Sequence, residues 1–81
     1  MPKVFEWKGY RFHFFSNEGY PLEPSHIHVR KGPHRAKFWI EPMVSLASNY
    51  GFTSKELSKF QSAIEENKAL IKEKWHEHFN I

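Results

Sequence analysis

Residues 26–40 read HIHVRKGPHRAKFWI, and their pattern predicts the centre of the fold. In its first five residues the aliphatic side chains of Ile27 and Val29 alternate with imidazole and guanidinium groups, which is the period of a β-strand. The sequence KGPH at 31–34 contains Gly and Pro and predicts a turn. Residues 35–41 alternate again between an apolar face and a face that carries Lys37, Trp39 and Glu41. The stretch therefore predicts two antiparallel strands whose apolar side chains share one face of a sheet.

The residues on either side extend this sheet. Residues 4–7 are β-branched and aromatic, the Lys-Gly pair at 8–9 can turn the chain, and residues 10–16 alternate. This second alternation gives one face with Tyr10, Phe12 and Phe14 and another with Arg11, His13 and Phe15. Residues 17–24 contain Asn, Gly and two Pro and predict a loop. Residues 44–47 form one more short strand or a loose turn, and residues 49–52 form a connector, so we expect four or five strands.

Residues 53–81 have the period of a helix. Thr53 and Glu56 have the spacing of a capping box, in which each side chain satisfies a free backbone N–H of the first turn. One helix of about 26 residues would be about 39 Å long, which is more than so small a sheet can cover. The helix therefore either bends near Asn67 or projects and packs on another chain. Its apolar stripe is formed by Leu57, Phe60, Ile64, Ile71, Trp75 and Phe79.

These patterns together predict an α+β fold, an antiparallel sheet of four or five strands with one face covered by a long C-terminal helix, straight or bent. The length of 81 residues allows one domain over 1–81, in which residues 1–52 are mainly β and residues 53–81 are helical. The first part holds seven Lys/Arg and four Glu, a charge of +3, whereas the second holds five of each. The basic, aromatic part is where we expect a partner that carries negative charge.

The composition excludes several classes of protein. The chain has no Cys, which excludes a disulfide scaffold, a thiolate zinc site and a cysteine nucleophile. It has no Asp, which argues against a Ser-His-Asp triad, and no glycine-rich phosphate loop. The sequence shows no apolar run of ~18 residues and no signal-peptide pattern. We therefore expect a cytoplasmic protein with no membrane partner.

The face of the sheet away from the helix is predicted to mix cations, imidazoles and aromatic rings. Cations attract phosphate, and unstacked bases can lie on the rings, so this face suits single-stranded RNA or DNA. The residues expected to bind nucleic acid are Arg30, Lys37, Trp39 and His13. The alternatives are a protein partner, or the ordinary polar face of an antiparallel sheet with a small aromatic cluster.

His26 and His28 are predicted to project from this face side by side. One imidazole could serve as general base and the other as general acid, while Arg11, with Lys37, holds a phosphate and Glu18 orients a histidine. Cleavage of RNA through its own 2′-OH needs only such groups, so this mechanism uses no metal and no cofactor. A metal-dependent enzyme is a further alternative, but its third ligand (Glu18, Glu23, His13 or His34) has no diagnostic spacing. The remaining alternative is purely structural: both histidines are exposed and form hydrogen bonds with groups of the loop.

Nearly the whole chain resembles a small bacterial family of domains of unknown function that includes the type II toxin–antitoxin toxin DhiT. The motifs that carry the resemblance are Tyr10-Arg11-Phe12, Ser16-Asn17-Glu18, Glu23-Pro24, His26-Ile27-His28-Val29, Ala36-Lys37-Phe38-Trp39, Pro42, Gly51-Phe52, Glu56-Leu57, Glu66-Asn67 and Trp75-His76. Residues 19–22 depart from the family by lengthening or varying the loop before the histidines.

The resemblance implies a toxin and a small antitoxin partner encoded by the adjacent gene. The family's shared polar positions add the loop residues Ser16, Asn17 and Glu23 to the histidines, Arg11, Glu18 and Lys37. The first hypothesis is therefore a toxin that acts on RNA through His26, His28, Arg11 and Glu18. The second is a non-enzymatic module that binds protein or nucleic acid, with a homodimer through the helical stripe as one version. The third is the metal-dependent enzyme.

Overall fold

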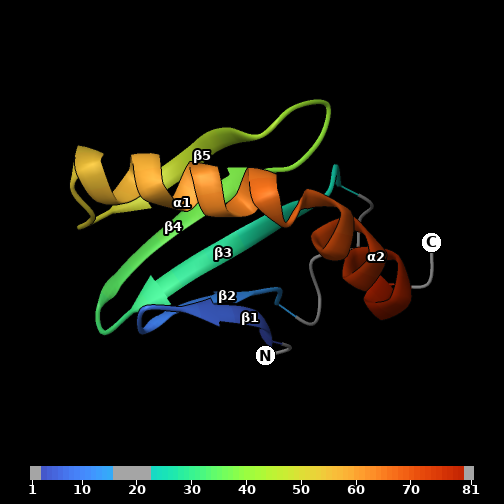
Figure 1. Cartoon of the computed structure of the whole chain (residues 1–81), viewed down its shortest axis with the longest axis horizontal. Helices are drawn as coiled ribbons and strands as arrows, with labels where there is room; N and C mark the ends of the chain where they lie inside the picture. The colour runs from blue at the N-terminus through green and yellow to red at the C-terminus, as the bar shows by residue number, and fades with distance from the viewer. Residues whose placement is uncertain (1–2, 16–22, 80–81) are drawn as a thin grey trace.

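The computed structural model describes residues 3–15 and 23–79. It contains five strands followed by two helices (Figure 1). The strands are β1 (Lys3–Trp7), β2 (Tyr10–His13), β3 (His26–Lys31), β4 (His34–Trp39) and β5 (Ser45–Tyr50). The helices are α1 (Ser54–Glu66) and α2 (Lys68–Phe79). The α+β fold expected from the sequence is confirmed, and the described residues form five strands.

The sheet is an antiparallel meander in which every strand pairs with its neighbour in sequence, in the order β1-β2-β3-β4-β5. Residues 26–39 form the β3–β4 hairpin at the centre, with Ile27 opposite Phe38 and Val29 opposite Ala36. The undecided segment after Pro42 is a strand. It includes Asn49 and Tyr50, so the expected connector over 49–52 is wrong for these two residues.

The helical region divides at Asn67, so of the two alternatives predicted from the sequence, a bend there or a projecting end, the bend is the one observed. The Thr53–Glu56 capping box is present: Glu56 N donates to Thr53 Oγ1 (3.1 Å) and Thr53 N donates to Glu56 Oε1 (3.0 Å). At the other end of α1, the Asn67 side chain donates to the carbonyl of Ala63 (2.7 Å), and its backbone leaves helical geometry at φ −110° and ψ 16°. Because this amide competes for helical hydrogen bonds, α2 starts in a new direction.

The change of direction lets both helices pack on the sheet. Figure 1 shows α1 lying across β3, β4 and β5, while α2 lies at the end of the sheet. Phe60 of α1 is fully buried among Tyr10, Phe12 and Phe52, with ring centroids 4.7, 5.9 and 4.8 Å away. The stripe residues Phe60, Ile64, Ile71 and Trp75 are all buried within this chain. The stripe therefore builds the chain's own core, and the version of a homodimer that needs it exposed is wrong.

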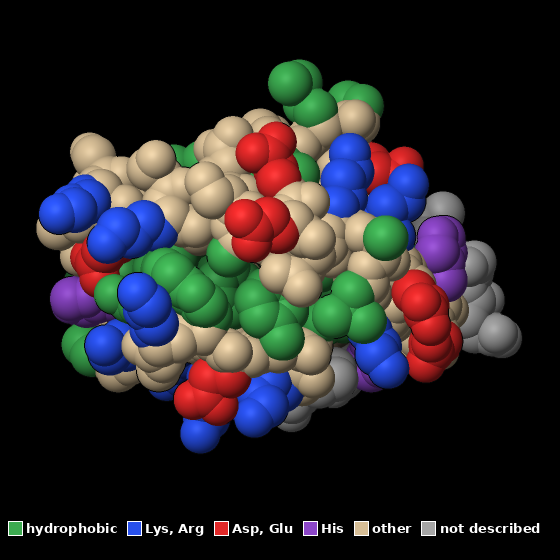
Figure 2. Space-filling view, in the orientation of Figure 1, with side chains coloured by type: hydrophobic (Ala, Val, Ile, Leu, Met, Phe, Trp, Pro, Cys, Tyr) green, Lys and Arg blue, Asp and Glu red, His purple; other side chains and the backbone are tan. Residues whose placement is uncertain are grey.

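The predicted apolar face of the sheet is confirmed. Its core residues are Phe12, Phe14, Ile27, Val29, Ala36, Phe38 and Ile40, and Tyr10 is half-buried beside them. On the helix-bearing side, a strip of hydrophobic side chains stays visible between α1 and the β1–β2 hairpin (Figure 2). Neither of the described helices is long and apolar enough to cross a membrane.

Candidate nucleic-acid interface

Three arginines stand in a line across the face of the sheet that the helices leave bare. Arg11 of β2 pairs with Arg30 of β3, and Arg30 pairs with Arg35 of β4. Residues that pair directly project from the same face, and neighbouring strands are about 4.8 Å apart, so the three Cα atoms span roughly 10 Å. All three side chains are exposed. None of them forms an ion pair with a carboxylate of the described residues. We call this line the arginine row.

Tyr50 extends the arginine row onto β5. It pairs with Arg35, and the Arg35 Cζ atom lies 5.2 Å from the centre of the Tyr50 ring. The ring is 64% exposed, which leaves most of it open for a contact with another molecule. The row thus ends in an aromatic surface that a base can stack on.

A second line, which we call the histidine row, runs parallel to the first. His13 pairs with His28, and His28 pairs with Lys37, whose partner on β5 is Ser48. The two imidazole rings are stacked, with centroids 5.7 Å apart and an interplanar angle of 16°. Phe15 covers His28 from the β2 side at 4.4 Å. The histidine row lies two residues along the strands from the arginine row, a separation of roughly 7 Å.

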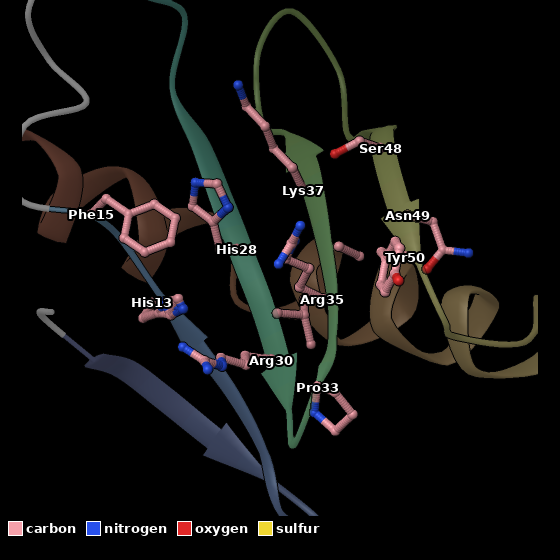
Figure 3. A pocket seen from close by; sticks show the side chains of 12 residues that line it. His13, Phe15, His28, Arg30, Pro33, Arg35, Lys37, Ser48, Asn49 and Tyr50 are labelled. Carbon is pink, nitrogen blue, oxygen red and sulfur yellow. The ribbon is translucent and has the colours of Figure 1, made fainter.

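Both rows, apart from Arg11, line a hollow of about 800 Å³. Figure 3 shows Phe15, His13 and His28 gathered on one side of it, with Arg35 and Lys37 across from them and Arg30 below. The lining residues are His13, Phe15, His28, Val29, Arg30, Pro33, Arg35, Ala36, Lys37, Ser48, Asn49 and Tyr50. A surface of this kind offers positive charge to a phosphate backbone and rings to bases.

His26 does not lie open on this face as predicted. It pairs with Trp39, and its ring lies 5.4 Å from that of His28, but the side chain is fully buried. The reason is the second helix, which brings Trp75 to 4.9 Å from the His26 ring, while Trp39 lies at 5.5 Å. The His26 Nδ1 atom is 2.9 Å from the carbonyl oxygen of Pro24. The expectation of two exposed imidazoles is therefore wrong for His26, whereas His28 is half-buried and lines the hollow.

Of the other predicted residues, Arg11 lies outside the hollow, whereas three others line it. Arg11 belongs to the arginine row, four residues along the strand from His26, which is roughly 13 Å. It therefore does not share a site with His26. His13, Arg30 and Lys37 line the hollow, although His13 is itself only 3% exposed.

Lys37 is held at one end of the hollow. Its Nζ atom lies 4.4 Å from the ring centre of Trp39 and 3.7 Å from Glu23 Oε1. The Glu23 carboxylate is half-buried and offsets part of the positive charge of Lys37. Ser16, Asn17 and Glu18 lie outside the described residues, so the orienting role of Glu18 stays a prediction. Within residues 3–15 and 23–79, no three His or Glu side chains cluster closely enough to hold a metal ion.

Sequence reasoning missed three contributors to this face, namely Arg35, Ser48 and Tyr50. Arg35 carried a usable signal, because it precedes Lys37 by two residues on the same predicted strand and must share its face. Ser48 and Tyr50 gave no such signal, because the sequence did not decide whether this part of the chain forms a strand.

Comparison with known proteins adds a family to this geometry. Residues 9–76 match the family described as Domain of unknown function (DUF4160). This match includes both rows, from Arg11 to Tyr50, and most of the helical region. No match was found among the curated proteins or among the solved structures. The family match spans well over half of the sequence, and the chain belongs to the DUF4160 family of domains of unknown function.

Proposed function

We propose that the chain binds single-stranded RNA on the bare face of the sheet. The observation that carries this proposal is the arginine row of Arg11, Arg30 and Arg35, of which Arg30 and Arg35 line one hollow together with aromatic rings. Sequence-tolerant binders of single strands combine these two features, a cationic track for the backbone and aromatic platforms for the bases.

The spacing of the two rows suggests how a strand would lie. The phosphates would follow the arginine row across the strands, since its three cations have no competing carboxylate among the described residues. The bases would point toward the histidine row and stack on Phe15 and His28, or on Tyr50 at the β5 end. Each such stack contributes about 1–3 kcal/mol, so affinity needs few of them.

Fluorescence anisotropy with a short labelled oligouridine tests the proposal. The variant Arg30→Ala/Arg35→Ala removes two exposed cations from the row, and the control Lys55→Ala/Lys59→Ala removes two exposed cations from α1 on the other side of the sheet. The expected result is a large loss of affinity for the arginine variant and near-wild-type affinity for the control. Equal losses in both would show that only the overall charge matters and would overturn the proposal.

A matched oligodeoxyuridine and a blunt RNA duplex complete the experiment. A single strand can splay its bases onto rings, whereas duplex bases remain stacked on one another. We therefore expect the duplex to bind more weakly than the single strand at the same salt concentration. Tighter binding of the duplex would contradict the stacking part of the proposal.

Cleavage of the bound RNA is a second candidate, favoured by the position of His28. Its half-buried ring lines the hollow, and its neighbour in the histidine row is the cation Lys37. The His28 imidazole could take the proton of a 2′-OH, whose oxygen attacks the phosphorus while the bond to the 5′-oxygen breaks and that oxygen takes a proton from water. The arginines would hold the phosphate during this step. We expect His28→Ala to stop cleavage while binding is only weakened, by the loss of one stacking contact, about 1–3 kcal/mol. Cleavage that continues in this variant at the wild-type rate would remove His28 from the mechanism.

The toxin role implied by the resemblance to DhiT, together with its antitoxin partner, is part of the same proposal. Expression of the wild-type chain is expected to arrest bacterial growth, and co-expression of the adjacent gene product is expected to relieve the arrest. The arginine variant should be harmless at equal protein level. Full toxicity of that variant would separate toxicity from the bare face of the sheet.

A further inference from the structure

A second surface lies on the opposite, helix-bearing side of the sheet. A groove of about 310 Å³ runs between the start of α1 and the β1–β2 turn. Trp7, Tyr10 and Phe60 supply its apolar part. In Figure 2, Lys and Arg side chains surround the left end of the hydrophobic strip below α1. The groove shares no lining residue with the hollow on the bare face.

The floor of the groove is built from stacked rings. Trp7 stacks on Tyr10 at 5.9 Å, and Tyr10 meets Phe60 edge-on at 4.7 Å. Trp7 and Tyr10 are only half-buried among the described residues, so part of each side chain stays exposed. Rings of this size and rigidity are the usual anchors of protein interfaces.

The single carboxylate of the groove is already occupied. The Tyr10 hydroxyl donates to Glu56 Oε2 at 2.7 Å, and the Thr53 backbone N–H donates to Glu56 Oε1 at 3.0 Å. The hydrogen bond from the Thr53 backbone, followed by that from Tyr10, lowers the pKa of Glu56, and the same contact raises the pKa of Tyr10. Glu56 thus fastens α1 to β2. Its carboxylate stays ionised and offsets one positive charge, so the lysines around the groove leave it with net positive charge.

The rim of the groove is cationic. Lys8 lies 5.1 Å from the centre of the Trp7 ring, and Lys31 lies 4.6 Å from the centre of the Tyr10 ring. Lys55 and Lys59 add two exposed cations on α1. Among the ion pairs of the described residues, none involves these four lysines. A ligand of the groove must therefore bring negative charge around an apolar centre.

We propose that this groove docks an acidic amphipathic helix of a partner protein. Lys55 and Lys59 are four residues apart and so form a short line along the edge of α1. A partner helix that lies beside α1 can match this line with acidic residues at the same spacing and insert an apolar side chain over Trp7 and Tyr10. Because this surface and the arginine row are on opposite faces, the proposal stands whether or not the chain binds RNA.

A peptide selection on the full chain tests the proposal. A phage-displayed library of random peptides is selected on the wild-type protein, and the recovered peptides are then tested on the charge-reversed variant Lys55→Glu/Lys59→Glu. We expect enriched peptides that are acidic, with apolar residues at helical spacing. We expect their affinity to fall by roughly tenfold or more on the variant, because two attractions become repulsions.

The control variant is Arg30→Ala/Arg35→Ala, which should bind the peptides as the wild type does. The circular dichroism spectrum and melting temperature of each variant verify its fold, and both substituted lysines are exposed, so the fold is expected to persist. The proposal is overturned if no acidic amphipathic class is enriched. It is also overturned if the enriched peptides bind the lysine variant unchanged, or if they respond to the arginine variant instead.

Discussion

The salt dependence of RNA binding gives the most quantitative prediction of the proposed function. The arginine row presents three cations that have no carboxylate partner among the described residues. For a single strand, each phosphate neutralised contributes about −0.7 to the slope of log K against log salt concentration. Three contacts therefore predict a slope of about −2, before any share from Lys37, which is partly offset by Glu23.

Removing Arg30 and Arg35 should change this slope by about 1.4 and leave about −0.7 from Arg11. Between about 50 and about 200 mM salt, the wild-type affinity then falls about 18-fold, whereas the variant's falls less than about threefold. The control Lys55→Ala/Lys59→Ala should keep the wild-type slope.

Anisotropy titrations of the same labelled oligouridine at several salt concentrations measure these slopes. A double arginine variant whose slope equals that of the wild type would refute the reasoning, because the cations would then make no phosphate contact. A wild-type slope close to zero would refute it as well, since phosphate binding without counterion release is not expected.

Three further predictions concern the scaffold. The lowered pKa of Glu56 means that folding stability falls as pH drops below about 4.5 through the folded-state pKa, and the raised pKa of Tyr10 means that stability also falls above pH 10.0. In urea denaturation at a series of pH values, Glu56→Gln should reduce the loss of stability on the acid side. An unchanged loss in this variant would contradict the prediction. Gly51→Ala should lower the melting temperature, because the residue has φ +99° and a Cβ there would lie 2.7 Å from the His34 ring; a neutral result would show that the turn can rearrange. Trp75→Ala should cost about 3–5 kcal/mol by urea denaturation, since the ring is 2% exposed, and a wild-type midpoint would count against its place in the core.

The periodicity of the sequence was enough to predict the fold, because local patterns determine most of it. Alternation in residues 26–40 predicted both the central hairpin and its buried face. The capping box at Thr53 and the expected bend near Asn67 are also local, and both are present. The β5 strand was harder to predict. Its sequence SLASNY has little apolar periodicity, and pairing with β4 at one edge of the sheet gives it its structure.

The candidate site was predicted in part for the same reason. The alternation of side chains between the two faces of a strand placed Arg11, Arg30 and Lys37 correctly on the bare face. It could not predict that His26 would be covered, because this depends on where α2 lies after Asn67, a long-range consequence of packing. The alternation along a strand assigns a side chain to a face of the sheet, whereas the exposure of that side chain depends on which other elements cover the face.

The most direct test of the central claim is an NMR titration of the isotope-labelled chain with oligouridine. We expect the largest shift changes at the side chains of Arg30 and Arg35 and at the rings of Phe15, His28 and Tyr50, with α1 nearly unaffected. Shift changes confined to α1 and the β1–β2 turn, or none at saturating RNA, would contradict it.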